Sequence, residues 1–519
     1  MLFGKEFIKT RRFVISAPGF VFKALIICLP IVSFGQRENN IWMMGNYQPN
    51  LNSGIDFNSG SPDTFSVLRN LDFYLLNASI CDTTGMLLFY TNGQYVANRI
   101  HDTLLNSVNF NPGYLTNYYS PYGMGLPQGA FVIPRPDHYG QYYLFHESGE
   151  LVSVSGRVAS QPVKLSCSLI DMSLDGGLGG IDPLFKNKTV IADTLIYGRV
   201  SGVKHANGRD WWVVVHRSDS DLYHSLLVTP DSIYGPYSQN IGRPHHFEQF
   251  TQQCTFSPSG EKYVMELSVD TVTLHNVIEL LDFDRCTGIF TNPRQIDVPD
   301  TSLLAPGCSF SPNSRFLYVS NQLNIYQYDT WDSNINSSVI TVAQWDSFMS
   351  PLKTKFYSHQ LAPDNKIYIS TSEGTNVLHY INNPDLHGTA CDVIQNSFFL
   401  PSYNNFCMPN APNYVLGPVI GSLCDTLYNS IVESLLIDNT IVAFPNPASD
   451  QITFQFTSIG VDQELQILDI IGRVLISESV PNYTLSTKID LTKLSPGSYI
   501  AFLSGGFSLR RKCKFTVVH

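Results

Sequence analysis

Short apolar strands alternate with polar turns along most of the chain, and one strand–turn–strand unit recurs. The strings CTFSPSGEKYV, CSFSPNSRFLYV and QLAPDNKIYI begin at Cys254, Cys308 and Gln360. Each joins a short strand, through a Ser-Pro or Ala-Pro turn, to a strand rich in β-branched and aromatic residues, which is the pattern of a β-hairpin. Fainter copies come earlier, and the turns align at Asp82, Pro134, His205, Pro258, Pro312 and Pro363.

A hairpin that returns roughly every fifty residues predicts a β-propeller, because a single blade cannot bury both faces and must stack on its neighbours. Strand pairs between the hairpins, such as 271–274 with 277–284, supply the outer strands of each blade. Residues 378–416 complete a seventh blade together with 40–44 and close the ring. We predict seven blades over residues 36–418, with six or eight as alternatives. A β-sandwich array also explains the hairpins, but not one turn at a fixed spacing.

The end of the chain has a different pattern. Residues 452–456, 464–469, 498–503 and 513–518 alternate apolar and polar side chains with period two. This is typical of half-buried strands in a small β-sandwich. We therefore predict an all-β chain in which residues 419–442 link the propeller to a sandwich at 443–519.

Composition and charge narrow the classes of function. Aromatic residues make up 12% of the chain and charged residues only 14%, which favours strands over helical bundles. The net charge is −11, although the first thirty-five residues are basic, so the middle of the chain is strongly acidic. An acidic body disfavours nucleic acid as a partner, because phosphates bind Lys- and Arg-rich surfaces.

The N-terminal residues 1–35 have the pattern of a signal peptide. A basic flank precedes the apolar run 24–32, and the small residues Ser33 and Gly35 follow it. We expect cleavage after Gly35, which leaves Gln36 first; a buried core helix is the alternative. The run is too short to span a bilayer, and no other run approaches that length, so we expect no transmembrane segment in the mature chain.

The sandwich region carries a recognisable set of motifs: FPNPASD from Phe444, ILDIIGR at 467–473, LSPGSYI at 494–500 and RRKCK at 510–514. Their order resembles the type A C-terminal sorting domain of type IX secretion cargo in Bacteroidota. The residues that match are Pro445, Asn446, Pro447, Gly472, Gly497, Tyr499, Lys512 and Lys514. The resemblance implies Sec and type IX machinery as partners, passage through the periplasm to the surface or the medium, and removal by a surface sortase within residues 419–442. The Phe-Ser-Pro turn is similar to that of WD40-like and TolB-like propeller blades.

The chain has ten cysteines, of which eight lie between the leader and the sandwich. An oxidising compartment permits disulfides, but sequence does not give their pairing. The candidate pairs are Cys286 with Cys308, Cys391 with Cys407, and Cys407 with Cys424. Cys254 and Cys308 occupy the same repeat position and also fit small buried residues that face the channel.

Familiar catalytic motifs are absent from the sequence. His245, His246 and Glu248 offer metal ligands, but adjacent histidines on a strand face opposite ways, so we predict a solvated loop there. Asp219 with Asp221, and Asp282 with Asp284, suit structural calcium or acid/base chemistry as well as ordinary turns. We identify no cofactor.

Two aromatic segments are candidates for ligand binding. His205, Trp211 and Trp212 lie near one hairpin, and Tyr119 lies in the Tyr-rich stretch 114–122, which is typical of an exposed recognition loop. Such rings could stack on sugars, whereas a tryptophan pair in a propeller also fits the core between blades.

Asp-Ser/Thr-apolar triplets are of the kind that Bacteroidota O-glycosylate, and those that end in Leu, Ile or Val occur more often than composition predicts. Their acceptors are Thr103, Thr194, Ser232, Thr271 and Thr426. Ordinary turn formation by Asp-Thr is the alternative.

Three functions fit these observations: a surface or secreted module that binds extracellular glycan or protein, a secreted hydrolase or lyase with its site in the propeller mouth, and a structural protein of the cell envelope. A channel lined by Asp, Glu and His would favour the enzyme, and an exposed aromatic patch would favour the binder.

Overall fold

The computed structural model describes residues 36–46, 51–154, 157–245, 253–268, 276–299, 307–425, 441–456, 463–469, 473–482, 484–505 and 509–518. Regular structure in these residues is almost entirely β, which confirms the predicted class. The one α-helix among them, α1 (Tyr114–Tyr118), is little more than a turn long.

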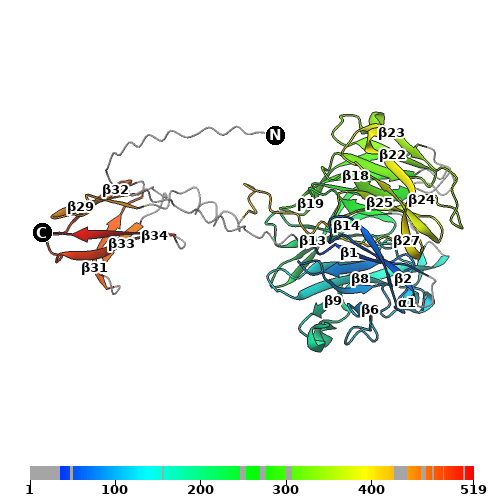
Figure 1. Cartoon of the computed structure of the whole chain (residues 1–519), viewed down its shortest axis with the longest axis horizontal. Helices are drawn as coiled ribbons and strands as arrows, with labels where there is room; N and C mark the ends of the chain where they lie inside the picture. The colour runs from blue at the N-terminus through cyan, green and yellow to red at the C-terminus, as the bar shows by residue number, and fades with distance from the viewer. Residues whose placement is uncertain are drawn as a thin grey trace, which may run out of the picture. The chain divides into compact units, whose positions relative to one another are not determined.

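Before residue 405 the described strands form seven sheets, each built from consecutive strands, so the predicted number of blades is confirmed. Strands of each of these sheets are labelled in Figure 1. In chain order the sheets are β1 (Ile41–Met44), β2 (Asn52–Asp56) and β3 (Asp63–Val67); β4 (Ala78–Cys81), β5 (Leu87–Thr91) and β6 (Val96–Asn98); β7 (Ala130–Pro134), β8 (Gln141–Val154), β9 (Arg157–Asp171), β10 (Gly180–Ile181) and β11 (Lys188–Ala192); β12 (Ser201–Lys204), β13 (Trp211–His216), β14 (Ser220–Val228) and β15 (Ile233–His245); β16 (Cys254–Phe256), β17 (Lys262–Ser268), β18 (Asn276–Asp284) and β19 (Ile289–Asp297); β20 (Gly307–Phe310), β21 (Phe316–Ser320), β22 (Asn324–Asp329) and β23 (Ile340–Gln344); β24 (Phe356–Leu361), β25 (Ile367–Thr371), β26 (Thr375–Ile381) and β27 (Val393–Asn404).

Burial within a sheet falls from its first strand to its last. In the fourth sheet every residue of β12 is buried, whereas most of β15 is exposed. First strands of neighbouring sheets contact one another, as β12 contacts β16 and β16 contacts β20. The last sheet meets the first where β27 contacts β2 and β3. First strands therefore surround a central channel, and the blades bury their faces against each other, as propeller blades must.

The recurring turn has a specific hydrogen-bond chemistry. Ser257 Oγ accepts from the backbone N–H of Lys262 at 3.1 Å, and Ser311 Oγ accepts in the same way from Phe316 at 2.9 Å. Gly260 has a φ of 75°, in the left-handed region that the tip of the turn requires. The serine of each Ser-Pro turn thus satisfies an amide that the tight loop would leave unpaired.

The predicted way of closing the ring is wrong in one respect. Leu378 lies in β26, within the same sheet as the Pro363 turn, so 378–416 and 40–44 do not share a sheet. The strands β1 to β3 form a sheet of their own instead. Cys407 and Met408 pack on the side chains of β1, but no strand pairing joins them to it in the described residues.

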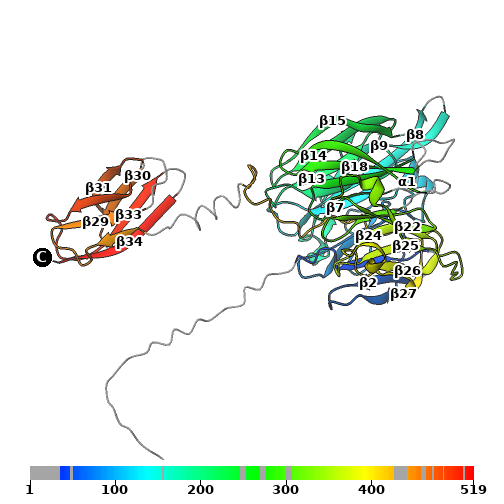
Figure 2. The same ribbon diagram turned by 90° about the horizontal axis from the view of Figure 1, so that it is seen from above.

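Residues 441–518 form two further sheets, visible in Figure 2. Their strands are β28 (Val442–Phe444), β29 (Gln451–Gln455) and β32 (Ser486–Asp490) in one sheet, and β31 (Val474–Val480), β30 (Gln463–Leu468), β33 (Gly497–Gly505) and β34 (Leu509–Val517) in the other. Alternate residues of these strands point inward and form one core with Phe454, Leu465 and Phe515. The predicted sandwich is therefore confirmed.

Candidate functional site

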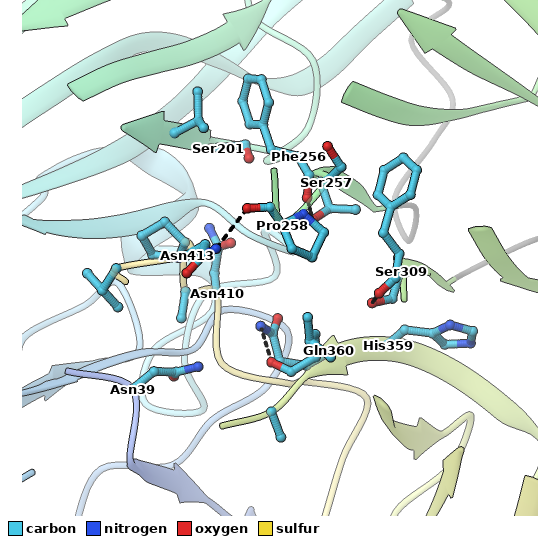
Figure 3. Close-up of a pocket in the computed structure, with 18 of the residues that line it drawn as sticks. Asn39, Ser201, Phe256, Ser257, Pro258, Ser309, His359, Gln360, Asn410 and Asn413 are labelled. Carbon is cyan, nitrogen blue, oxygen red and sulfur yellow. Dashed lines mark hydrogen bonds between the residues drawn. The ribbon is translucent and has the colours of Figure 1, made fainter. Parts of the chain in front are cut away.

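A cavity of about 440 Å³ occupies the channel at the end that carries the hairpin turns (Figure 3). Its wall is made from the first strands β12, β16, β20 and β24, the turns that follow them, and the chain after β27. Most of its polar side chains are amides and hydroxyls: Gln36, Asn39, Asn40, Gln128, Gln253, Gln360, Asn365, Asn410, Asn413, Ser201, Thr255, Ser257 and Ser309. Phe57, Phe131, Phe256, Phe310 and Tyr414 add aromatic surface.

Two glutamines join first strands that share no strand pairing. Gln128 donates from Nε2 to the carbonyl of Cys254 and accepts at Oε1 from its N–H, both at 2.9 Å. Gln253 accepts from the N–H groups of Cys308 and His359 and donates to the His359 carbonyl at 3.0 Å. Inner-edge backbone groups need partners because they are buried. The glutamines supply these partners and so connect the blades around the cavity.

The chain after β27 crosses the channel. Asn410 donates from its backbone N–H to the Asn77 carbonyl, and from Nδ2 to the carbonyls of Ala130 and Val200 at 2.8 and 2.9 Å. Tyr414 donates from its hydroxyl to the Val132 carbonyl at 2.8 Å. This segment contacts the second, third and fourth sheets and forms one wall of the cavity.

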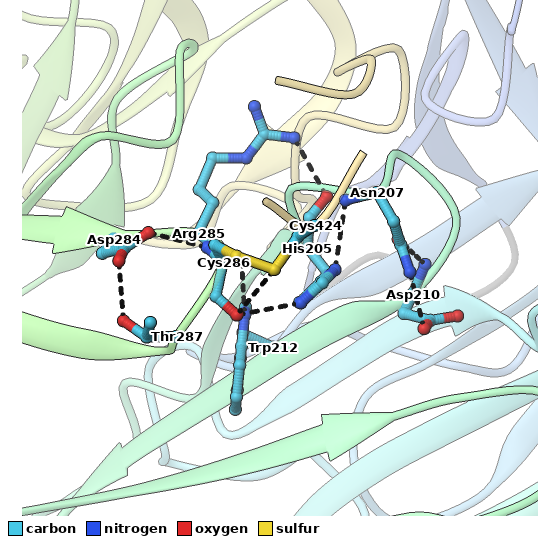
Figure 4. Close-up of a disulfide and its surroundings, with 9 residues drawn as sticks. All are labelled: His205, Asn207, Asp210, Trp212, Asp284, Arg285, Cys286, Thr287 and Cys424. Carbon is cyan, nitrogen blue, oxygen red and sulfur yellow. Dashed lines mark hydrogen bonds between the residues drawn. A yellow bond between two sulfur atoms is a disulfide. The ribbon is translucent and has the colours of Figure 1, made fainter. Parts of the chain in front are cut away.

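A disulfide between Cys286 and Cys424 fixes the end of this segment to the turn between β18 and β19, with their Cα atoms 5.6 Å apart (Figure 4). Val419 also donates from its backbone N–H to the Ala206 carbonyl at 2.8 Å. Contact with the propeller thus continues to the disulfide, past the boundary predicted at residue 418. Residues 426–440 of the predicted linker lie outside the described residues.

The predicted cysteine pairs are wrong, although Cys286 and Cys424 were both candidates. Cys286 is bonded to Cys424, and Cys308, on the first strand β20 in the wall of the cavity, is free and buried, as are Cys391 and Cys407. Cys254 and Cys308 are free, buried and beside the channel, as their shared repeat position predicted.

The described lining of the cavity contains no Asp, Glu, Lys or Arg. Burial lowers the pKa of its one histidine, His359, to about 3, so that imidazole is neutral at neutral pH. Burial raises the pKa of the Cys254 thiol to about 12 and also raises that of Cys308, so neither is a ready nucleophile. The residues that line the cavity can donate and accept hydrogen bonds, but they do not offer a carboxylate pair for acid/base catalysis.

Acidic groups do lie near the channel, but they are enclosed. Glu147 and Glu266 are fully buried, and burial raises the pKa of both. Glu147 accepts from the Gly198 N–H at 2.9 Å, and Glu266 accepts from the Gln253 N–H at 3.1 Å. These carboxylates hold backbone groups and do not reach the cavity.

Three of the predicted ligand residues are buried in the propeller. Trp211 and Trp212 are 2% and 4% exposed, and they point to opposite faces of β13, into the cores shared with the third and fifth sheets. His205 is 8% exposed and its Nε2 lies 3.0 Å from the Cys286 carbonyl oxygen (Figure 4). Their prediction as a stacking surface is wrong, because alternation along a strand directs adjacent rings into two separate cores.

Tyr119 lies elsewhere, at the end of the channel opposite the hairpin turns. Its ring is half-buried and 5.9 Å from that of Tyr74, centroid to centroid. It directly follows α1, whose Tyr114 and Tyr118 are exposed. A role for Tyr119 in binding stays a prediction.

The carboxylate pairs are engaged in local hydrogen bonds. Asp221 accepts from Asn240 at 2.7 Å, and Asp284 accepts from the N–H of Cys286 at 2.8 Å. Among the described residues no group of three or more His, Cys, Asp or Glu side chains has metal-binding geometry. His245 is buried against Glu279, at 3.3 Å, and is not in a solvated loop; His246 and Glu248 lie outside the described residues.

Of the triplet acceptors, Thr103 and Ser232 are exposed and Thr194 is half-buried. Thr271 and Thr426 lie outside the described residues. Glycan attachment at these positions stays a prediction.

The sorting motif residues have clear positions in the sandwich. Asn446, between Pro445 and Pro447, accepts from the Thr516 N–H at 2.9 Å and donates to the Lys514 carbonyl. Gly497 begins β33, and two residues later Tyr499 donates to the Ser495 carbonyl at 2.6 Å. Lys512 and Lys514 are exposed on β34. Gly472, Gly35 and the leader lie outside the described residues, whereas Gln36 is exposed beside the cavity.

Comparison with known proteins bears on both parts of the chain. Residues 442–514 match the family model of the secretion system C-terminal sorting domain. Comparison with curated proteins finds no match to this chain. In the part that the structure describes, no helix is long and apolar enough to cross a membrane.

Solved structures similar to this chain have low identity. A protein from Lactobacillus plantarum is 14% identical, with 72% of this chain and 99% of that one covered and a TM-score of 0.40. A protein of unknown function from Desulfotomaculum acetoxidans is 12% identical, with 70% and 99% covered and a TM-score of 0.35. The Cps50 (Swd1) β-propeller domain of Myceliophteria thermophila is 10% identical, with 65% and 94% covered and a TM-score of 0.33. The assignment of a seven-bladed propeller depends on the seven sheets of this structure and not on these similarities. The chain thus carries a type IX secretion C-terminal sorting domain behind a seven-bladed β-propeller, and this domain marks it for export to the cell surface or the medium.

Proposed function

We propose that the exported propeller is an extracellular binding module and that its central cavity holds an uncharged, hydrogen-bonding ligand, the end of a glycan chain or a peptide segment. The observation that carries the proposal is the composition of the cavity wall, which joins amides and hydroxyls to aromatic rings without an ionised side chain in its described lining. Ligand sites commonly combine apolar walls with a few placed polar groups.

Several of these polar groups have hydrogen-bonding capacity to spare. Gln360 is half-buried, and within the described part of the chain its Nε2 donates a single bond, of 3.2 Å, to the neighbouring Leu361 carbonyl. Asn365, at the tip of its turn, is exposed. Figure 3 shows Gln360 and Asn413 on different sides of the space, with Ser309 opposite Asn413. A ligand with several hydroxyl or amide groups could bond to more than one wall at once.

The cavity gives less support to a hydrolase or lyase, because acid/base catalysis needs titratable groups beside the substrate. It gives no specific support to a structural role in the envelope either. A neutral ligand suits an acidic protein better than a polyanion does, since like charges repel at short range.

A glycan and peptide array probed with the purified secreted protein tests the proposal. The variant Gln360→Glu places a carboxylate in the uncharged cavity, and we expect a loss of affinity of about tenfold or more for the array ligand, because a charge without a partner is costly to desolvate. The matched control is Gln344→Glu, which adds the same charge on an exposed position of the outer strand β23.

Equal binding by the two variants would place the ligand outside the cavity. If the wild-type protein bound no glycan and no peptide on the array, the proposed binding function would be wrong. Thermal unfolding of both variants shows whether either substitution disturbs the fold.

A further inference from the structure

A row of aromatic rings lies at the end of the channel opposite the hairpin turns. Its members follow one another at centroid distances of 5.9 Å for Tyr114 and Tyr118, 5.1 Å for Tyr118 and Tyr119, 5.9 Å for Tyr119 and Tyr74, and 6.0 Å for Tyr74 and Phe406. They come from α1 and the residue after it, from the connection between β3 and β4, and from the chain after β27. We call these five residues the aromatic row. It does not include residues that line the central cavity.

The outer end of the row is exposed and ordered by the fold. Tyr118 is 66% exposed, and its ring is nearly parallel to that of Tyr114, with an interplanar angle of 21°. Leu115, between them, is buried against Gly149 of β8, where a Cβ atom would lie 2.1 Å from the leucine side chain. The absence of a side chain at Gly149 therefore seats α1 on the propeller, and the two tyrosines face outward.

The inner end of the row is supported by a second glycine. A Cβ atom at Gly125 would lie 2.2 Å from the Tyr119 ring, so this ring packs directly on the backbone there. Tyrosine rings fixed in this way present wide contact surfaces and lose little conformational entropy on binding.

The two segments that supply most of the row are uncharged over unusual lengths. No Asp, Glu, Lys or Arg lies between Asp102 and Arg135, or between Asp392 and Asp425, in a chain where charged residues make up 14%. One carboxylate, that of Glu150, contacts α1: its Oε2 accepts from the Tyr114 N–H at 3.3 Å. These two segments contribute neither the cations that a polyanion requires nor a cluster of anions that would attract a basic protein, and Tyr74 comes from a third segment, two residues after Asp72.

We infer that the aromatic row is a second binding surface, separate from the central cavity, and that it takes a neutral polysaccharide chain. Aromatic rings cover the apolar C–H faces of sugars, while the phenol hydroxyls and uncharged neighbours such as Asn117 bond to sugar hydroxyls. The exposed and nearly parallel rings of Tyr114 and Tyr118 can contact neighbouring sugars of an extended chain. Tyr118 with Tyr119, and Tyr74 with Phe406, meet edge to face at 89° and 82°, so the half-buried rings add apolar edges beside that contact. The inference stands on these residues and does not require a ligand in the cavity.

Affinity electrophoresis of the purified secreted protein in gels that contain xylan, mannan or β-1,3-glucan tests the inference, with alginate and chitosan as charged counterparts. We expect retardation by at least one neutral polymer. Tyr118→Ala should weaken it about tenfold, the scale of one lost stacking contact, while Tyr118→Phe, which keeps the ring, should retain most of it. Tyr139→Ala is the matched control, because Tyr139 is 93% exposed in the turn between β7 and β8 and should not contribute.

Salt and the cavity variant complete the test. Binding of a neutral chain should change little between about 0.05 and 0.5 M salt, since screening acts on charges. Retardation that remains in Gln360→Glu and is lost in Tyr118→Ala comes from the row and not from the cavity, whereas retardation lost only in Gln360→Glu would overturn the inference. The inference is overturned if no neutral polymer retards the protein, if Tyr118→Ala behaves as Tyr139→Ala does, or if the row captures a charged polymer or a protein in a salt-dependent way.

Discussion

Loss of the Cys286–Cys424 disulfide should destabilise the propeller without disturbing its blades. The bond joins residues 138 positions apart and fixes the segment that crosses the channel. In the double variant Cys286→Ser/Cys424→Ser this segment keeps its hydrogen bonds, including that of Asn410 to the Val200 carbonyl at 2.9 Å, but it loses its covalent end.

The size of the effect follows from the length of the closed loop. The chain-entropy model gives about 5 kcal/mol for a loop of 138 residues. Measured values for natural disulfides cluster lower, so we expect about 2 to 5 kcal/mol. For a propeller of this length that corresponds to a fall in Tm of about 2 to 6 °C.

Thermal unfolding with and without a thiol reductant measures this directly. The other cysteines that the structure describes are free, so reductant should lower the Tm of the wild type to that of the double variant and leave the variant unchanged. Peptide mapping of the oxidised protein should recover the two cysteines in one linked pair. An unchanged Tm on reduction, or a linkage of Cys286 to Cys308, would refute the reasoning.

Three further predictions concern side chains of the propeller. Trp212→Ala should lower the free energy of unfolding by about 3 to 5 kcal/mol in urea titration and leave ligand affinity unchanged, because the ring fills a core; lost binding with unchanged stability would contradict this. Gln253→Met should lower the free energy of unfolding by about 1 to 3 kcal/mol for each buried amide left unpaired, including that of Cys308. An unchanged free energy of unfolding would show that water replaces the glutamine. His359 has a folded-state pKa of about 3, below the unfolded value of about 6.5, so folding expels its proton and wild-type stability falls as the pH drops below 6.5. The destabilisation caused by His359→Gln should therefore shrink by up to about 2 kcal/mol between pH 6.5 and pH 5, and a constant difference would show that the imidazole is not buried in its neutral form.

The sequence was most informative where a local pattern has one structural solution. The Ser-Pro turn recurs because the hydroxyl of Ser257 or Ser311 satisfies an amide within its own hairpin. The aligned turns marked six of the seven sheets, whereas the first sheet, β1 to β3, carries no copy that was recognised. The sorting domain was recognisable for the same reason, since Asn446 and Tyr499 act through contacts inside one small sandwich.

Features that depend on contacts between blades could not be predicted. Gln253 resembles any other glutamine in the sequence, yet it connects three first strands because the ring brings them together. Cys424 pairs with Cys286 because the chain after β27 crosses the channel. The spacing of the cysteines in the sequence does not indicate this path of the chain. The prediction of a sugar-binding surface at Trp211 and Trp212 failed for a related reason. In a sequence, a tryptophan that could bind a sugar cannot be distinguished from one that fills a core, because its burial is not known.

A crystal structure of the secreted protein with its array ligand tests the central claim most directly. The account predicts ligand density in the central cavity, with hydrogen bonds to Gln360 and to at least one of Asn365, Asn413 and Ser309, and with the Cys286–Cys424 bond intact. Density confined to another part of the protein, with the cavity filled only by water, would contradict it.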